Sequence, residues 1–174
     1  MNPFSLIHIT NSYTFNAQKK LEGMGPGLQN KNNNAKVLII EDNETELEIL
    51  HETITSMGYN SCKACDAEQA LIQIISERFD IALIDINLPG KNGLELLQIF
   101  SEKYKHMKNI IITGHSSLET AKKAVLFGAD GYLSKPYDVG ELEGLMGKCL
   151  RGKAGRSRKK IDDKDMMNRF YKPI

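Results

Sequence analysis

The sequence predicts an α/β fold in which one parallel sheet is covered by helices on both faces. Short apolar runs of three or four residues alternate with longer segments whose apolar residues recur every three or four positions. The first pattern is typical of buried strands and the second of amphipathic helices. Strands with continuous apolar runs are covered on both faces, which indicates a parallel, doubly wound sheet.

Five strands and five helices are predicted, in alternation along the chain. The strands are expected at residues 37–40, 59–62, 81–84, 110–112 and 131–133. Apolar residues at helical spacing indicate the helices, at residues 47–57, 70–75, 94–100, 118–125 and 139–150. In such a (βα)5 order the carboxyl ends of the strands lie along one edge of the sheet, where these folds bind ligands.

Polar residues are expected to cap four of the helices. Asn43, Asp66, Ser116 and Asp138 each lie three residues before a Glu or Gln, which is the spacing of a capping box. The remaining helix should begin at Gly93, eight residues after Asp85.

The chain divides into a central domain, at residues 36–150, and two extensions. Residues 1–35 end in a Gly- and Asn-rich segment that should be flexible, and Met24 is an alternative start. The domain holds 11 basic and 18 acidic residues, whereas residues 151–174 hold nine basic and three acidic. No aromatic residue interrupts the basic run at 151–160, so we expect a solvated tail and no direct DNA binding.

Composition excludes several classes of protein. No apolar run approaches the length of about 18 residues that a membrane span requires, and the N-terminus lacks the features of a secretory signal. Three cysteines favour a reducing, cytoplasmic location. Cys62 and Cys65 have CxxC spacing, but Cys62 is expected in a strand and Asp66 at the helix cap, which disfavours a redox or zinc site.

Charged and polar residues follow the predicted strands. Glu41 and Asp42 follow the first strand, Asp85 the third and Thr113 the fourth, and Lys135 comes just after the fifth. Two unit charges about 4 Å apart repel by roughly 4 kcal/mol at an effective dielectric constant near 20. Three carboxylates at one edge therefore need a shared proton or a cation.

Magnesium is the expected cation at this edge. Carboxylate oxygens that leave room for water suit Mg²⁺, whereas Zn²⁺ prefers Cys or His. Lys135 supplies a flexible positive charge suited to phosphate, and Thr113 offers a hydroxyl donor. Lys135 and Thr113 could thus stabilise an additional negative charge beside Asp85.

Four segments resemble the receiver domain of two-component response regulators: VLIIEDN, LIDINLPGKNG, NIIITGHSS and GADGYLSKP. The order and spacing of the key residues match the receiver pattern. These residues are the acidic pair, the central Asp, the Thr and the Tyr-x-x-Lys-Pro motif. The resemblance covers residues 36–150. Within the family, this segment is similar to the receiver domains of nitrogen-regulation-type activators. Glu41 in place of Asp is a mild departure that we expect the site to tolerate.

The resemblance implies a fold and a set of residue roles. The fold would be flavodoxin-like, with five parallel strands in the order 2-1-3-4-5. Asp85 would accept a phosphoryl group from a sensor histidine kinase or a phosphotransfer protein. Thr113 and Lys135 would contact the phosphoryl oxygens, Tyr132 would be a rotating switch, and Pro136 would follow a cis peptide bond. The Mg²⁺ ligands would be Glu41, Asp42, Asp85 and the backbone carbonyl of Asn87.

We expect a stand-alone signalling module, because only 24 residues follow the fifth helix. Output should pass to a partner protein or a homodimer through the fourth helix, fifth strand and fifth helix. One alternative is a hydrolase that forms an aspartyl phosphate, but that chemistry needs its nucleophile after the first strand and a second Asp two residues on. Another is a constitutive pseudo-receiver, against which the intact acceptor set argues.

Overall fold

Five strands and five helices alternate along residues 34–151, the part of the chain that the computed structural model describes. The strands are β1 (Lys36–Ile40), β2 (Asn60–Ala64), β3 (Ile81–Ile84), β4 (Lys108–Thr113) and β5 (Gly131–Ser134). The helices are α2 (Glu44–Ser56), α3 (Ala67–Ser76), α4 (Gly93–Lys103), α5 (Leu118–Leu126) and α6 (Val139–Arg151). The expected extension before residue 34 and the tail after residue 151 lie outside the described residues.

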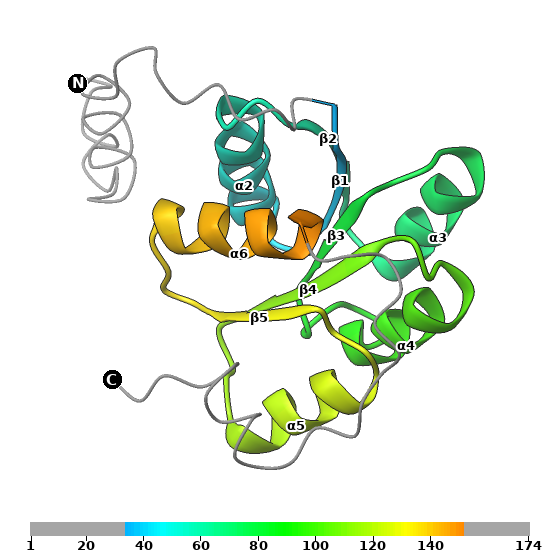
Figure 1. The fold of residues 1–174 in the computed structure, drawn as a ribbon. Helices are drawn as coiled ribbons and strands as arrows, with labels where there is room; N and C mark the ends of the chain where they lie inside the picture. Colours follow the sequence, from blue (N-terminus) through cyan, green and yellow to red (C-terminus); the bar gives the residue numbers. More distant parts are fainter. Residues whose placement is uncertain (1–33, 152–174) are drawn as a thin grey trace, which may run out of the picture. The chain divides into compact units, whose positions relative to one another are not determined.

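The sheet has the strand order β2-β1-β3-β4-β5, and all its neighbouring strands are parallel (Figure 1). The predicted fold class and strand order are therefore confirmed. The chain leaves β1 toward one edge and returns to β3 on the other side of β1, so the carboxyl ends of β1 and β3 meet where the strand order reverses. Ile40 pairs with Ile84 in this register, which brings the next residues, Glu41 and Asp85, side by side.

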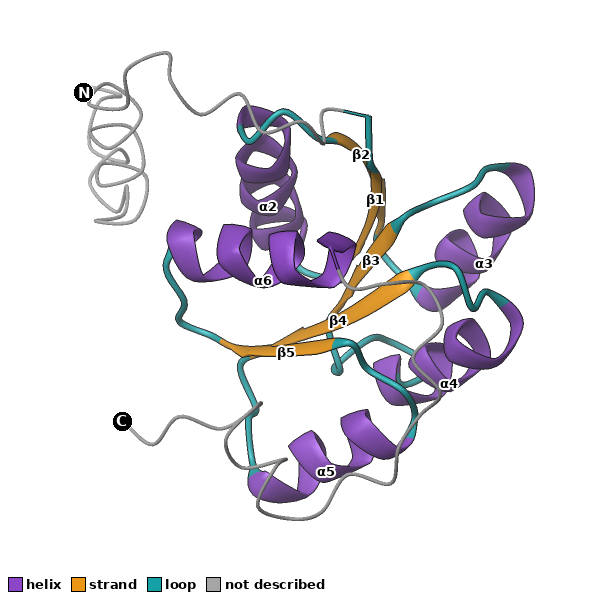
Figure 2. Ribbon diagram, in the orientation of Figure 1, coloured by secondary structure: helices purple, strands orange, loops and turns teal. Residues whose placement is uncertain are grey.

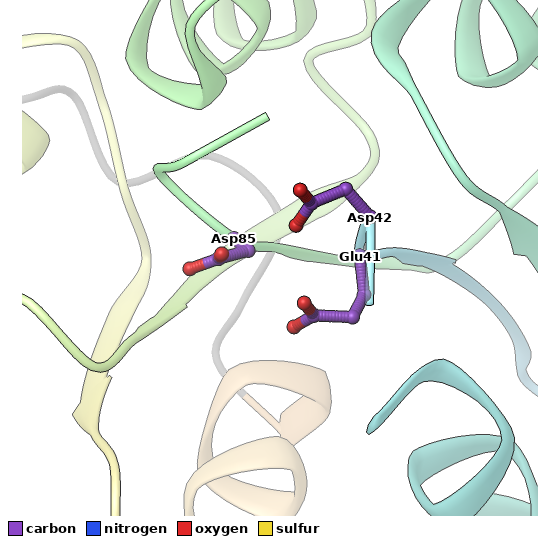
Figure 3. A group of neighbouring side chains, drawn as sticks. All are labelled: Glu41, Asp42 and Asp85. Atoms are coloured by element: carbon purple, nitrogen blue, oxygen red, sulfur yellow. The ribbon is translucent and has the colours of Figure 1, made fainter. Parts of the chain in front are cut away.

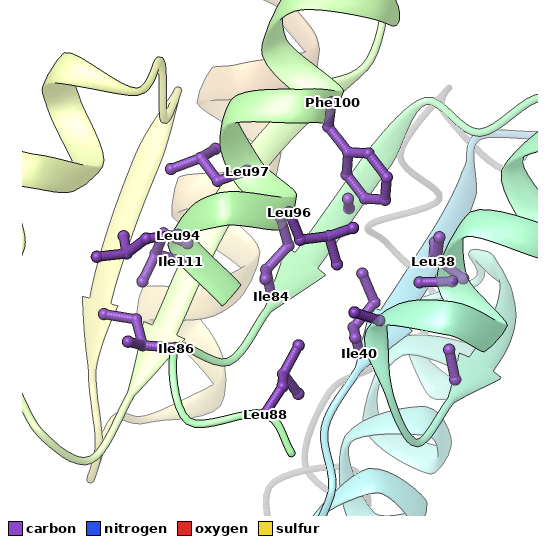
Figure 4. Packing of buried hydrophobic residues seen from close by; sticks show 14 of the residues in the cluster. Leu38, Ile40, Ile84, Ile86, Leu88, Leu94, Leu96, Leu97, Phe100 and Ile111 are labelled. Carbon is purple, nitrogen blue, oxygen red and sulfur yellow. The ribbon is translucent and has the colours of Figure 1, made fainter. Parts of the chain in front are cut away.

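Helices α2 and α6 cover one face of the sheet, and α3, α4 and α5 cover the other (Figure 2). Alternate residues of β1 supply the two layers. Leu38 and Ile40 belong to the cluster under α3, α4 and α5, while Val37 and Ile39 belong to the cluster under α2 and α6. Each such buried aliphatic side chain contributes about 1.5–3 kcal/mol to folding. Figure 4 shows the first cluster, in which residues of α4 such as Phe100 meet β1 and β3.

The start of α4 lies directly against the end of β3. The Gly93 amide donates a hydrogen bond to the Ile86 carbonyl at 3.0 Å, and the Asn92 side chain caps the helix by accepting from the Leu94 amide. A Cβ atom at position 93 would lie 1.9 Å from the Asp85 carbonyl oxygen. Glycine therefore permits the approach that fixes the loop following Asp85.

Two expected positions are wrong. Strand β2 is Asn60–Ala64 rather than 59–62, because this edge strand is partly exposed and lacks the continuous apolar run of the central strands. Ser117, not Ser116, caps α5, since the Ser117 and Thr120 side chains each accept the other's backbone N–H. Ser116 instead accepts a hydrogen bond from the Ser134 hydroxyl. The expected caps Asn43 and Asp66 are confirmed.

The Asp138 side chain accepts a hydrogen bond from the Glu141 amide, as the capping spacing predicted. The peptide bond between Lys135 and Pro136 is cis, as the family resemblance implied. Among residues 34–151 no helix combines the length and apolar character needed to cross a bilayer.

Candidate functional site

Three carboxylates gather at the carboxyl ends of β1 and β3. One oxygen from each of Glu41, Asp42 and Asp85 lies within 4.8 Å of the other two, and Figure 3 shows the three side chains together beyond the strand ends. Backbone bonds continue the sheet one residue past both strands, from the Glu41 amide to Ala64 and from the Asp85 amide to Ile40. Glu41 and Asp85 are buried as a result, whereas Asp42 is exposed.

Burial raises the pKa of Asp85 above its ordinary value of 3.8. The Lys135 charge and the Ile86 amide, which donates to Oδ1 at 2.9 Å, oppose that rise, and the Asp42 charge adds to it. Burial likewise raises the pKa of Glu41 above 4.5, against hydrogen bonding from Lys135. The carboxylates are therefore costly to keep charged together, and a cation would relieve that cost.

Lys135 supplies positive charge to the cluster. Its Nζ donates to Glu41 Oε2 at 2.6 Å and to Glu46 Oε2 at 2.5 Å. Burial alone would lower the pKa of the ammonium, but the bonds to both glutamates and the Asp85 charge hold this pKa above its ordinary value. Lys135 is therefore charged at neutral pH.

Two residues of the site were missed by sequence reasoning. Glu46 follows Glu41 by five positions and lies in the first turn of α2, where an acidic residue also suits the helix dipole, so its pairing with Lys135 had no separate signal. Tyr137 lies two residues after Lys135, and burial raises its pKa to about 12 against the lowering effect of the Lys135 charge. Its hydroxyl is therefore protonated at neutral pH beside the charged cluster.

The expected switch residues are both buried. Thr113 is fully buried at the end of β4, and its Oγ1 accepts a hydrogen bond from the His115 amide at 3.2 Å. Tyr132 on β5 is 7% exposed, and its hydroxyl lies 3.1 Å from Thr120 Oγ1 on α5. In this conformation the tyrosine ring already lies inside the fold and is tied to α5.

Two exposed loops meet above the strand ends. The Asn87 side-chain nitrogen lies 2.8 Å from His115 Nδ1, which joins the loop after β3 to the loop after β4. Because the amide nitrogen is a donor, Nδ1 is the accepting nitrogen of the His115 ring.

The donor set fits Mg²⁺. Hard oxygen ligands from Glu41, Asp42 and Asp85 suit this ion, and the exposure of Asp42 leaves one side open to water. The Lys135 side chain also contacts the cluster, but its ammonium nitrogen cannot bind a metal while charged.

The described part of the protein is thus a small α/β domain with a parallel sheet. Its distinguishing feature is a buried aspartate at the carboxyl edge of the sheet, next to other carboxylates and a lysine. This chain belongs to the response regulator receiver family: the sequence model described as "Response regulator receiver domain" matches residues 37–146.

Characterised relatives support this assignment. The chain is 30% identical to sporulation initiation phosphotransferase F of Bacillus subtilis, over 67% of this chain and 94% of that protein. It is 36% identical to the DNA-binding transcriptional regulator NtrC of Proteus hauseri, over 66% of this chain and 24% of that protein. It is 31% identical to response regulator protein FleR of Pseudomonas aeruginosa, over 68% of this chain and 25% of that protein. The chain thus spans about a quarter of the length of the two longer relatives.

Solved structures agree with the sequence relatives. A CheY-like receiver domain protein from Methanospirillum hungatei matches with a TM-score of 0.63 and 32% identity, covering 67% of this chain and 93% of that one. Chemotaxis protein CheY4 of Vibrio cholerae also matches with a TM-score of 0.63, at 28% identity, covering 67% of this chain and 98% of that one.

Receiver domains of this family take part in phosphorylation-controlled signalling together with histidine kinases and effector partners. Receivers of this family bind Mg²⁺ at an acidic pocket, and the carboxylate cluster is the corresponding feature here. Because relatives include a DNA-binding regulator, the expected absence of direct DNA binding stays a prediction.

Proposed function

We propose that Asp85 accepts a phosphoryl group from the phosphohistidine of a sensor kinase or phosphotransfer protein, and that this controls binding to a downstream partner. One observation carries the proposal: a buried, desolvated aspartate shares the carboxyl edge of the sheet with two further carboxylates and a charged lysine. Such a cluster costs folding energy, which indicates a role in chemistry rather than in stability.

In the proposed transfer, an Asp85 carboxylate oxygen attacks the phosphorus of the donor. The bond between the histidine nitrogen and phosphorus breaks, an oxygen–phosphorus bond forms, and the donor imidazole leaves. Lys135 and Thr113 contact the phosphoryl oxygens. Glu41, Asp42, Asp85 and the Asn87 backbone carbonyl would hold Mg²⁺, and the bound ion would supply positive charge to offset the charge on the transferred group.

The relatives support a module of this kind. The Bacillus subtilis relative is named a phosphotransferase and is matched over nearly its whole length. A protein with that domain alone can relay a phosphoryl group or present a changed surface. We propose the latter as output, through α5, β5 and α6, to a partner protein or a second copy of the chain.

The proposed surface combines apolar and charged residues on elements linked to the site. Leu126 on α5 is 78% exposed, Lys122 is half-buried on the same helix, and Glu141 is exposed on α6. Tyr132 connects this region to the fold interior through its bond to Thr120 of α5. Thr113 lies at the end of β4, just before the loop that leads to α5. A movement of the Thr113 side chain could therefore be passed to α5 and so to this surface.

The test is phosphorylation of the purified protein by acetyl phosphate and Mg²⁺, followed on phosphate-affinity gels. Wild type should shift, whereas Asp85→Asn and wild type in excess chelator should not. Equal shifts in wild type and Asp85→Asn would rule out Asp85 as the acceptor.

The same preparation separates the hydrolase alternative. A receiver takes up one phosphoryl group per chain and releases it slowly, whereas a hydrolase turns over a generic phosphomonoester many times. We expect stoichiometric modification without turnover.

A further inference from the structure

Lys135 is held by two carboxylates that belong to different parts of the fold. Glu41 is 5% exposed and is a member of the carboxylate cluster, while Glu46 is 48% exposed, stands on α2 and is not a member. Both bonds to the Lys135 ammonium are short. Glu46 thus binds the lysine from the solvent side without taking part in the proposed metal site.

A phosphoryl group on Asp85 would need the same ammonium. It adds a charge of about −1.5 to −2 with three acceptor oxygens. If Lys135 contacted these oxygens while still paired with Glu46, the carboxylate and the phosphoryl group would lie close together on one cation and repel each other. Glu46 can move into water at low cost because its side chain is half exposed, whereas buried Glu41 cannot.

We infer that Glu46 is a positioning residue that holds Lys135 in the unphosphorylated state and competes with the phosphoryl group for it. The inference rests on the proposed function of Asp85. It adds that the Glu46–Lys135 ion pair limits how readily Asp85 is phosphorylated. A partner that presents a cation to Glu46 would release Lys135 and so favour phosphorylation.

The size of the effect follows from the exposure of the pair. Ion pairs with a solvent-exposed member contribute about 0.2–1 kcal/mol, so release of Lys135 should change rates or affinities by up to about fivefold. We therefore expect Glu46→Gln to be phosphorylated by acetyl phosphate about two- to fivefold faster than wild type. Its affinity for beryllofluoride in the presence of Mg²⁺ should rise by the same factor.

Glu44→Gln is the matched control. Glu44 lies in the same first turn of α2 and is exposed, but the two bonds of Lys135 go to other residues. Both variants remove one negative charge near the site and one favourable charge at the helix N-terminus. Any difference between them therefore reports on the contact with Lys135.

Two further measurements separate positioning from general charge removal. In a Lys135→Ala background, the extra effect of Glu46→Gln over Glu44→Gln should disappear. In the unmodified protein labelled with ¹⁵N-lysine, the Lys135 ammonium signal should shift and broaden in Glu46→Gln but not in Glu44→Gln.

The outcomes are distinct. Equal rates and affinities in Glu46→Gln and Glu44→Gln, or a difference that persists without Lys135, would overturn the inference while leaving the role of Asp85 intact. If wild type took up no phosphoryl group at all, the proposed function would fail, and the ammonium signal would still show whether Glu46 holds Lys135.

Discussion

Asp85 is kept in an environment that favours its neutral form. Burial raises its pKa, and the Asp42 charge raises it further. The folded protein therefore binds a proton at Asp85 more tightly than the unfolded chain does. It follows that the contribution of Asp85 to stability is most favourable below pH 3.8 and is lost as the pH rises through the folded-state pKa.

This argument predicts that Asp85→Asn stabilises the protein at pH 7 in the absence of Mg²⁺. The free energy of unfolding should rise by about 0.5–2 kcal/mol, the usual gain from one stabilising substitution. The gain should shrink as the pH falls toward 3.8, because protonation then discharges the wild-type residue as well. Urea unfolding of both proteins across this range measures it. A variant less stable than wild type at pH 7 would show that the cluster is not strained.

We expect Asn87 and His115 to control how long the proposed phosphoryl group on Asp85 lasts. Their side chains bond at 2.8 Å from loops that follow β3 and β4, so we expect the pair to restrict the approach of water to Asp85 from outside. Losing one ordinary hydrogen bond is worth about 0.5–1.5 kcal/mol. We therefore expect Asn87→Ala and His115→Ala each to lose the phosphoryl group about two- to tenfold faster.

Ser116→Ala is a suitable control for these variants, because Ser116 lies on the His115 loop but bonds to Ser134. Autodephosphorylation is measured as the decay of the phosphorylated band after removal of acetyl phosphate. If all three variants decayed at the wild-type rate, the bonded pair would have no part in shielding the site.

At the scale of elements, the position of α4 depends on one glycine. A Cβ at Gly93 would overlap the Asp85 carbonyl oxygen, whereas a Cβ at Gly144, in the middle of α6, would meet nothing within 4 Å. Gly93→Ala should destabilise the fold by about 1–3 kcal/mol, since α4 must move from β3. Gly144→Ala should stabilise it by about 0.5–1 kcal/mol through helix propensity. Thermal unfolding of the two variants tests the contrast, and a neutral Gly93→Ala would contradict the close approach.

The link from the site to α5 is the second prediction at this scale. Thr113→Ala should leave phosphorylation of Asp85 largely intact but abolish any association that depends on it, since the Thr113 hydroxyl is the group that would move toward the phosphoryl oxygens. Such coupling is typically worth about 1–3 kcal/mol, or roughly 5–150-fold in affinity.

Sedimentation of the phosphorylated wild type, Thr113→Ala and Tyr132→Phe, alone and with a captured partner, measures this association. Tyr132→Phe keeps the ring and removes the bond to Thr120, so it tests whether that bond is needed. Undiminished association of Thr113→Ala on phosphorylation would show that the signal leaves Asp85 by another route.

For the whole molecule, the central strands could be predicted because strands buried on both faces consist of continuous apolar runs. Strand β3 is buried at every position and was placed at its observed bounds. The edge strand β2 was misplaced because Asn60 and Lys63 face solvent and weaken the apolar signal. The cap of α5 was misassigned because two adjacent serines compete, and only the packing decides between them.

The site, too, was predictable only in part from the sequence. Glu41, Asp42 and Asp85 were predicted to meet because strand ends converge in a parallel sheet, and their carboxylates do lie together. The contact of Lys135 with Glu46 depends on where the first turn of α2 stands relative to β5. No spacing rule along the chain specifies that distance, so only the folded structure shows it.

The most direct test of the account is the stoichiometry and location of phosphorylation in the full chain. After treatment with acetyl phosphate and Mg²⁺, the intact mass should show one added phosphoryl group, and borohydride reduction followed by peptide mapping should place it at Asp85. An unmodified chain under conditions that phosphorylate a known receiver, or a phosphoryl group at any other residue, would contradict the central claim.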